Sequence, residues 1–265
     1  MKITILSDLH LGIKGDPSNN FLIDENIFSQ YLKSTLDDSD LLILNGDTFE
    51  LWENIISPQE PPTIVGMLRS LMIERMERIV ASWKFMPEIL NNPKILLING
   101  NHDSLIRTDH LVTTKLVTNS LRLNLIGRKL YFAHGHQCDF YKSPLCFVSC
   151  SVSNLVDLFD PELDQNLEKL TDNFNLVSTK KVTQYANTLA QKLPCDVVIF
   201  GHTHKSCLIK TRSRYYINSG CVVGKKEVID EVVITSDDDK RTVNLSCHQI
   251  HVTTRTILNP LVVNI

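Results

Sequence analysis

The stretch KILLINGNHD, Lys94–Asp103, joins an apolar run to a dense group of polar residues. Four consecutive apolar residues, Ile95–Ile98, are typical of a strand that is buried on both faces. The next five residues, Asn99–Asp103, supply two amides and a glycine, followed at the end by an imidazole and a carboxylate. Such residues are common in ordinary turns, so the stretch alone also fits a simple loop. Its meaning depends on how the other predicted strands end.

Four further apolar runs are similar to the first one. They are short and nearly continuous, and they span Lys2–Leu6, Leu41–Leu44, Leu130–Phe132 and Val197–Phe200. Helical patterns lie between the runs, with apolar residues three or four positions apart, over Phe21–Leu36, Thr63–Trp83 and Val182–Leu193. This alternation of strands and helices predicts an α/β layered fold.

The last third of the chain has a different character. It is β-rich over Ser206–Asn218, Glu227–Thr235 and Thr242–Val252, and turn residues such as SDDDK at Ser236–Lys240 separate these segments. We expect antiparallel strands that complete a sheet. The expected fold is therefore a four-layer α/β/β/α sandwich in place of a single doubly wound sheet.

Residues 138–180 carry no strand signal. Apolar residues at helical spacing occur in LCFVSCSVSNLVDLF, and ELDQNLEKL follows Pro161. We interpret residues 138–180 as a helical insertion or lid, although an ordinary core helix fits the pattern equally well. Because 43% of the 265 residues are hydrophobic, we expect one domain, residues 1–265, that contains this insertion.

Composition restricts the partners and the cellular location. The formal net charge of −3 gives no bulk attraction for nucleic acid, so we expect no strong nucleic-acid binding. The seven cysteines form no disulfide framework and no C-x-x-C pair, which favours a reducing compartment. No apolar run reaches the roughly eighteen residues of a membrane span, and the apolar part of MKITILSDLH is too short for a signal peptide. We therefore expect a cytoplasmic protein.

Similar polar residues follow all five predicted strands. After KITIL comes SDLH, after LLIL comes NGD, after KILLI comes NGNHD, after LYFA comes HGH, and after VVIF comes GHTH. Because ligands bind beyond the carboxyl ends of strands in open α/β sheets, we expect these loops to meet at one rim. Four of the loops also place a glycine beside a candidate ligand, where close backbone approach favours a residue without Cβ: Gly46, Gly100, Gly135 and Gly201.

The residue types in these loops indicate a metal site. Six of the nine histidines lie in them, which isolated surface histidines would not explain. Carboxylate, imidazole and amide ligands together suit Mn, Fe, Zn or Ni. The candidate ligands, more than one ion needs, are Asp8, His10, Asp47, Asn101, His134, His202 and His204. We predict two divalent metal ions that share a bridging carboxylate.

The ordered series DLH, GD, GNHD, HG and GHTH, over residues 8–204, resembles the five-part signature of the calcineurin-like metallophosphoesterase superfamily. The resemblance implies two ligand sets, with Asp47 as the bridge and manganese as the expected metal. One set is Asp8, His10, Asp47 and His204, and the other is Asp47, Asn101, His134 and His202.

The resemblance also implies catalytic roles. His102 resembles the family's catalytic histidine, which lies beside the scissile phosphate, and Asp103 is expected to orient it. Two cations would lower the pKa of a shared water, so that a bridging hydroxide attacks the phosphorus. His102 would stabilise the phosphoryl group or protonate the leaving oxygen. His136 is a candidate substrate contact, and a structural or solvent-exposed role fits its position equally well.

Further segments favour one branch of the superfamily. SDLHLG, GDTFELW and HGHQCDF resemble the branch that contains UDP-2,3-diacylglucosamine hydrolase, the pyrophosphatase of lipid A synthesis. The implied substrate is a phosphorylated small molecule or lipid nucleotide, and the 138–180 insertion would bind acyl chains or contact a membrane surface. Those hydrolases commonly carry arginine at the position of His102, whereas a histidine resembles the generic superfamily pattern.

Three alternatives stay open. A phosphodiesterase or nuclease acting on nucleotides or nucleic acid would use the same metals. It needs a basic, aromatic-lined groove, and no motif in the sequence indicates one. A protein phosphatase would need a peptide groove, and no motif indicates one. A non-catalytic scaffold would keep the fold, but such proteins typically lose ligands, whereas every matched position is filled here.

Overall fold

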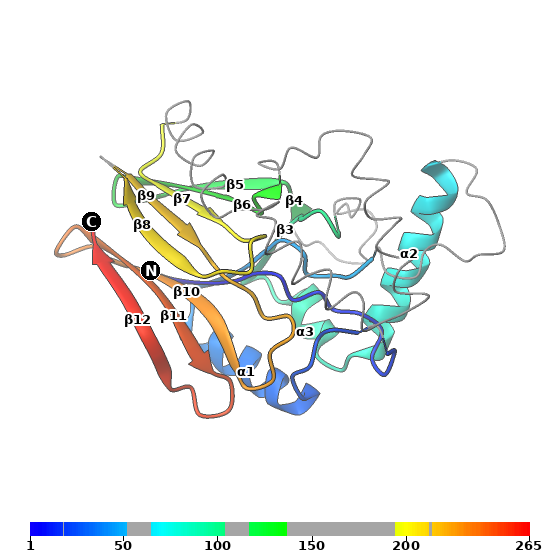
Figure 1. The fold of residues 1–265 in the computed structure, drawn as a ribbon. Coiled ribbons are helices and arrows are strands. Elements are labelled where there is room, and N and C mark those ends of the chain that lie inside the picture. Colours follow the sequence, from blue (N-terminus) through cyan, green and yellow to red (C-terminus); the bar gives the residue numbers. More distant parts are fainter. Residues whose placement is uncertain (18, 52–64, 104–116, 137–193, 212–213) are drawn as a thin grey trace, which may run out of the picture.

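Two β-sheets form the framework of the computed structural model (Figure 1), which describes residues 1–17, 19–51, 65–103, 117–136, 194–211 and 214–265. The larger sheet contains Lys2–Leu6 (β1), Leu41–Asn45 (β2), Ile95–Ile98 (β3), Val117–Thr118 (β4), Val228–Asp237 (β10), Thr242–His251 (β11) and Ile257–Asn264 (β12). The smaller sheet contains Ser120–Leu125 (β5), Arg128–Ala133 (β6), Val197–Phe200 (β7), Cys207–Thr211 (β8) and Arg214–Asn218 (β9). The strand orders are β12-β11-β10-β1-β2-β3-β4 and β5-β6-β7-β9-β8.

Both sheets are mixed. In the larger sheet β1, β2, β3 and β4 are parallel, with Ile5 opposite Ile43 and Ile43 opposite Leu96, and β10, β11 and β12 continue antiparallel. In the smaller sheet β6, β7 and β9 are parallel, while β5 and β8 are antiparallel to their neighbours. The predicted antiparallel C-terminal strands are confirmed for β8, β10 and β11. β9 is antiparallel to β8, as predicted, and in addition it pairs in parallel with β7.

Alternate residues of the central strands face different apolar layers. Leu42 and Leu44 pack in the cluster between the larger sheet and its helices, whereas Ile43 packs between the two sheets. In β7, Ile199 packs between the sheets and Val198 packs on the outer face of the smaller sheet. The continuous apolar runs therefore form strands that are buried on both faces, as predicted.

Three helices pack against the outer face of the larger sheet: α1 (Glu25–Asp38), α2 (Val65–Ser82) and α3 (Met86–Asn91). Asp24 caps α1, because its side chain accepts hydrogen bonds from the N–H groups of Asn26 (2.9 Å) and Ile27 (3.2 Å). This cap explains why α1 begins later than the predicted Phe21. The short helix α3 was not predicted, since six residues give too little periodicity to recognise.

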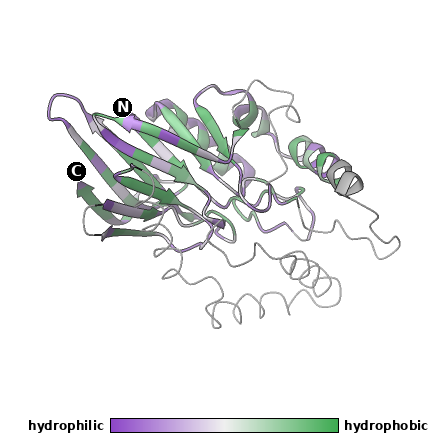
Figure 2. Cartoon of the chain, turned by 90° about the horizontal axis from the view of Figure 1, so that it is seen from above, coloured by the Kyte–Doolittle hydropathy of each residue, from purple (hydrophilic) through white to green (hydrophobic). Residues whose placement is uncertain are grey.

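The helices and the two sheets make three of the four layers of the predicted α/β/β/α sandwich, which confirms the α/β fold class. In Figure 2 hydrophobic residues follow the strands of both sheets, and hydrophilic residues gather in the loops. The helix predicted over 182–193 and the insertion predicted over 138–180 lie outside the described residues. Within the described part, no helix has the length and apolar character needed to cross a bilayer.

The edge strand β12 was not predicted from the sequence. It contains Pro260, whose missing N–H is tolerated only where no ladder partner needs it, such as at a sheet edge or a bulge. The register of the pairing with β11 shifts between Cys247 and Gln249, so the ladder is irregular close to the proline. A proline inside an apolar run normally argues against a strand, which is why the pattern was not recognised.

The strands that were predicted to converge end at one rim, where their loops approach closely. Gly46 follows β2 with φ of +91°, and a Cβ there would lie 2.2 Å from Nδ1 of His134, which follows β6. A Cβ at Gly100, after β3, would lie 1.9 Å from Oδ1 of Asp47. Only glycine permits these approaches, as the sequence predicted.

Replacing Gly46 by alanine is expected to destabilise the fold more than the same change at Gly127. Both glycines have a left-handed backbone, so both variants carry a cost of about 1 kcal/mol for a Cβ in that region. A Cβ at Gly46 also collides with His134, which adds about 1–3 kcal/mol, whereas one at Gly127 meets nothing within 4 Å. Urea denaturation measures both losses, and equal losses would contradict the close approach of the loops.

Candidate metal centre

Five of the predicted ligands have a left-handed backbone. Among the described residues nine non-glycine residues have positive φ, and five of them are Asp8 (55°), His10 (46°), Asp47 (49°), His202 (71°) and His204 (54°). This conformation costs a non-glycine residue about 1–3 kcal/mol and persists only where the surroundings enforce it, most often at functional sites. Its concentration in these loops marks the rim as such a site.

The loops after β1 and β2 hold each other through their backbones. The N–H of Asp8 donates to the carbonyl oxygen of Gly46 (3.1 Å), and the N–H of His10 donates to that of Asp47 (2.9 Å). Backbone pairing of the two strands therefore continues beyond their ends. It brings the loops that carry Asp8 and Asp47 side by side.

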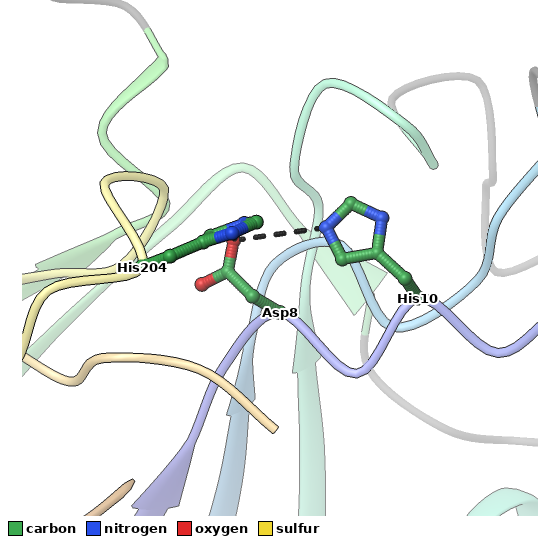
Figure 3. A group of neighbouring side chains, drawn as sticks. All are labelled: Asp8, His10 and His204. Carbon is green, nitrogen blue, oxygen red and sulfur yellow. Dashed lines mark ion pairs between the residues drawn. The ribbon is translucent and has the colours of Figure 1, made fainter. Parts of the chain in front are cut away.

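Asp8, His10 and His204 form a first cluster, and Figure 3 shows Asp8 between the two imidazoles. Oδ1 of Asp8 lies 3.2 Å from Nε2 of His204 and 3.9 Å from Nε2 of His10. Asp8 and His10 follow β1 of the larger sheet, while His204 follows β7 of the smaller sheet. The cluster therefore spans both sheets, and ligands about 2.1 Å from one ion would have similar separations.

Asp47, His134 and His202 form a second cluster. Oδ2 of Asp47 lies 3.0 Å from Nε2 of His134, and the rings of His134 and His202 have centroids 5.0 Å apart. The same Oδ2 lies 3.7 Å from Nε2 of His10, which belongs to the first cluster. Asp47 therefore lies between the two clusters, where a ligand shared by two ions would have to be.

Hydrogen bonds at Nδ1 orient two of the imidazoles. Nδ1 of His134 lies 3.0 Å from the carbonyl oxygen of Asn45, and Nδ1 of His10 lies 2.7 Å from Oε2 of Glu50. Both acceptors require a hydrogen on Nδ1, so Nε2 carries the lone pair in the neutral ring. This is the tautomer with which a histidine binds a metal through Nε2.

Two buried polar atoms test whether a cation fits. Nε2 of His10 makes no hydrogen bond to any residue that the structure describes, and Oδ1 of Asp8 lies 3.2 Å from Nε2 of His204 without an aligned hydrogen bond. The carboxylate oxygens of Asp47 and Asp8 lie 3.7 and 3.9 Å from Nε2 of His10, which is too far for a hydrogen bond. Native proteins rarely leave such atoms unsatisfied. A divalent cation would satisfy both, so the residues present fit a metal ion.

The carboxylates are ionised despite their burial. Burial raises the pKa of Asp8, but the neighbouring His134 and His204 outweigh it and lower this pKa to about 2. For Asp47, burial is likewise outweighed by His134 and then His102, so its pKa lies well below the usual range. Both side chains are therefore anionic at neutral pH, as metal ligands must be.

The same charges act on His134. Burial lowers its pKa, while Asp47 and then Asp8 raise it, with a net rise to about 9. In the absence of a cation, a proton on His134 thus balances the two carboxylates. A cation bound there would displace this proton.

The structure adds Glu50 to the site, a residue that sequence reasoning missed. Its buried carboxylate accepts hydrogen bonds from Nδ1 of His10 (2.7 Å) and Nδ1 of His102 (2.8 Å). Nε of Arg75, on α2, donates to the carbonyl oxygen of Glu50 (2.8 Å). The signal in the sequence was an acidic residue three positions after Asp47, inside the otherwise apolar segment FELW.

His102 lies beside the first cluster with its ring 4.5 Å from that of His10. Removal from water lowers the pKa of His102, but Glu50 and then Asp47 raise it to about 10. The backbone N–H of His102 donates to Oδ1 of Asp47 (2.8 Å). His10, Glu50 and His102 could also surround a cation, but their spacing is explained by the hydrogen bonds to Glu50.

The expected role of Asp103 needs correction. Its Oδ1 accepts the N–H of Gly100 (2.6 Å), and its Oδ2 accepts the N–H of Thr48 (2.7 Å). Burial, and then Asp47, raises the pKa of Asp103 to about 6. Asp103 thus ties the loop after β3 to the loop after β2, while the hydrogen bond that orients the ring of His102 comes from Glu50.

The other two predicted site residues also lie at the rim. Asn101 stands between Gly100 and His102, and its Oδ1 is buried. The ring of His136 has its centroid 5.6 Å from that of His134 and 6.4 Å from that of His202. Asn101 therefore lies on the loop after β3, and His136 lies beside two histidines of the rim.

Several solved structures are similar to this chain at low sequence identity. A conserved uncharacterized protein from Streptococcus pneumoniae TIGR4, described as a predicted phosphoesterase, is 14% identical, with a TM-score of 0.46 and coverage of 100% of this chain and 96% of its own. Yfce, a phosphoesterase from E. coli, is 14% identical, with a TM-score of 0.45 and coverage of 98% of both chains. Zinc-complexed Vps29 from Entamoeba histolytica is 11% identical, with a TM-score of 0.47 and coverage of 100% and 99%.

Most of the sequence matches a known family. A search of curated proteins found no match. The family profile described as calcineurin-like phosphoesterase, in contrast, matches residues 1–206, which include all the strand-end loops that build the two clusters. Because this match covers more than half of the 265 residues, the chain belongs to the calcineurin-like phosphoesterase family and is a metallophosphoesterase.

Proposed function

We propose that this chain hydrolyses a phosphoester or diphosphate bond with two divalent metal ions bound at the rim between the sheets. The observation that carries the proposal is the position of Asp47, whose Oδ2 lies 3.0 Å from Nε2 of His134 and 3.7 Å from Nε2 of His10. A carboxylate oxygen that faces both clusters is what a ligand shared by two ions requires.

Each proposed ligand set consists of one cluster and one further residue: Asp47 completes the first set, and Asn101 completes the second. The first ion would be held by Asp8, His10, Asp47 and His204, and the second by Asp47, Asn101, His134 and His202. When bound, the ions would activate a water molecule and neutralise the phosphate oxygens. The mixed carboxylate, imidazole and amide ligands favour manganese, with iron, zinc or nickel as alternatives.

His102 is proposed to act on the substrate. Its Nδ1 is engaged by Glu50, which fixes the ring and leaves Nε2 as the nitrogen that can contact a phosphate oxygen. A protonated ring would stabilise the negative charge of the phosphoryl group and donate a proton to the leaving oxygen. Glu50 would act through His102 as a positioning residue.

For the substrate we propose a lipid nucleotide similar to UDP-diacylglucosamine, cleaved at its diphosphate. The support is the resemblance of SDLHLG, GDTFELW and HGHQCDF to the UDP-2,3-diacylglucosamine hydrolase branch. We propose that the segment 138–180, which lies outside the described residues, binds the acyl chains or contacts a membrane surface.

The residue at position 102 favours a second candidate, a general phosphodiesterase that acts on nucleotides or nucleic acid. The hydrolases of that branch commonly carry arginine where this chain has His102, and histidine resembles the generic superfamily pattern. A non-catalytic scaffold is the candidate of another class. The complete set of ligand side chains at the rim counts against it.

A substrate panel distinguishes these candidates. We expect Mn²⁺-dependent hydrolysis of bis-p-nitrophenyl phosphate, p-nitrophenyl phosphate and a UDP-diacylglucosamine analogue, with the highest kcat/KM for the analogue. A preference for the diester would support the general phosphodiesterase instead. If a folded sample loaded with Mn²⁺ hydrolyses none of the three, the result would support the non-catalytic scaffold.

The variant His102→Ala is expected to lower kcat by about 100-fold, as for the loss of a general acid, and to leave the metal content unchanged. Steady-state kinetics and elemental analysis measure the two quantities. His251→Ala is the matched control. His251 lies on β11 and pairs with Glu227 in the loop before β10, so both quantities should stay at wild-type levels. Loss of metal from His102→Ala would show that His102 is a ligand.

The variant Asp47→Ala is expected to lose both ions, whereas Asp8→Ala should lose one. The reason is that Asp47 belongs to both proposed ligand sets, with its Oδ2 3.0 Å from Nε2 of His134 and 3.7 Å from Nε2 of His10, while Asp8 belongs to the first set only. Elemental analysis of the folded variants after dialysis counts the ions. Two ions retained by Asp47→Ala would rule out its bridging role.

A further inference from the structure

We propose that the ion pair between the buried Asp230 and the partly exposed Lys225 positions the ligands of the first metal cluster. This inference rests on the proposed function and extends it to residues outside every motif of the sequence. The two residues act through the connecting loop, residues 219–227, which joins β9 of the smaller sheet to β10 of the larger sheet. Neither is proposed to touch metal or substrate, so both are positioning residues.

The connecting loop binds the backbone of Asp8. The N–H of Val223 donates to the carbonyl oxygen of Asp8 (2.9 Å), and the N–H of Val222 lies 3.2 Å from the carbonyl oxygens of both Ser7 and Asp8. Val222 is fully buried, which anchors this part of the loop in the core. Because Asp8 has a φ of 55°, these bonds help to maintain the strained backbone that aims its carboxylate at the two imidazoles in Figure 3.

The same part of the chain also binds the end of β7, from which His204 comes. Nδ2 of Asn218, the last residue of β9, donates to the carbonyl oxygen of Gly201 (2.5 Å). Sγ of Cys221 lies 3.7 Å from the carbonyl oxygen of His204. The loop is thus bound to both strand ends that supply the first cluster, so its shape sets the separation of Asp8 and His204.

Asp230 fixes the shape of the connecting loop. Its Oδ2 accepts hydrogen bonds from Nζ of Lys225 (2.5 Å) and the N–H of Cys221 (3.1 Å), and its Oδ1 accepts one from Nε2 of Gln249 (3.2 Å). At Gly220, where φ is +71°, a Cβ would lie 2.4 Å from Oδ2 of Asp230. A buried carboxylate with a cation and an amide on the same oxygen is a strong, directional anchor.

The effect of this anchor should differ between the two metal sites. Asp8 and His204 of the first cluster belong to the segments that the connecting loop binds. Asp47 and His134 of the second cluster follow β2 and β6 instead, and its remaining member, His202, follows β7 like His204. A loosened loop would therefore misplace two ligands of the first ion and leave most of the second site intact.

Calorimetric titration of the metal-free protein with Mn²⁺ tests the proposal. For the wild type we expect two binding events. In Asp230→Asn, which keeps the shape of the side chain and removes its charge, we expect the affinity for one ion to fall by about 10–100-fold, the usual effect of removing a residue that supports a ligand. The affinity for the other ion should stay within about two-fold. Lys225→Met should produce the same split.

Asp237→Asn is the matched control. Asp237 also lies on β10 and pairs with a lysine, Lys240 (3.0 Å), but at the hairpin between β10 and β11, so both affinities should match the wild type. Asp230→Asn that melts at a lower temperature yet binds both ions normally would overturn the proposal, since the ion pair would then be structural only. If Asp230→Asn does not fold, Lys225→Met decides by the same criterion. A wild type that binds fewer than two ions would refute the proposed function and this inference together.

Discussion

The side chain of Asp47 is the contact on which the rest of the site depends. Its Oδ1 accepts the N–H of His102 and lies where any Cβ at Gly100 would be, and its Oδ2 faces His134 and His10. The loops after four strands therefore meet at one buried charge. Burial of a carboxylate is costly unless opposite charge and hydrogen bonds compensate it. The imidazoles supply that compensation, and the glycines and left-handed residues are what bring them within reach.

How far the sequence predicted this arrangement depended on the range of each interaction. The bounds of β1, β3 and β7 agree with their apolar runs, because burial on both faces is a local signal. The ligand positions were recognisable because each follows a strand closely. Glu50 was not, since its contact with His102 spans 52 positions and arises only when two loops meet. For Asp103 the sequence was misleading in the opposite way. Its place next to His102 suggested a local contact, but its carboxylate accepts a hydrogen bond from the backbone of another loop.

Sheet pairing was less predictable than strand position. The sequence indicated β segments in the last third of the chain, but it did not show that β8 and β9 join the smaller sheet while β10 and β11 join the larger one. Such partnerships depend on the core between the sheets, where residues far apart in sequence meet, such as Ile5, Phe132 and Ile234. Pro260 concealed β12 for a different reason, because a sheet edge tolerates the missing N–H that a central strand would not.

A site that draws ligands from both sheets makes the packing between the sheets part of its geometry. Asp8 and His204 lie 3.2 Å apart although they end strands of different sheets, and fully buried side chains such as Ile5 and Ile199 separate those sheets. Protein interiors are close-packed and transmit strain, so a change of volume in this core would alter the distance between the ligands. The connecting loop adds a second constraint at the rim itself. The rigidity of the core and the hydrogen bonds of this loop therefore act together to hold Asp8 and His204 at a separation that a cation can bridge.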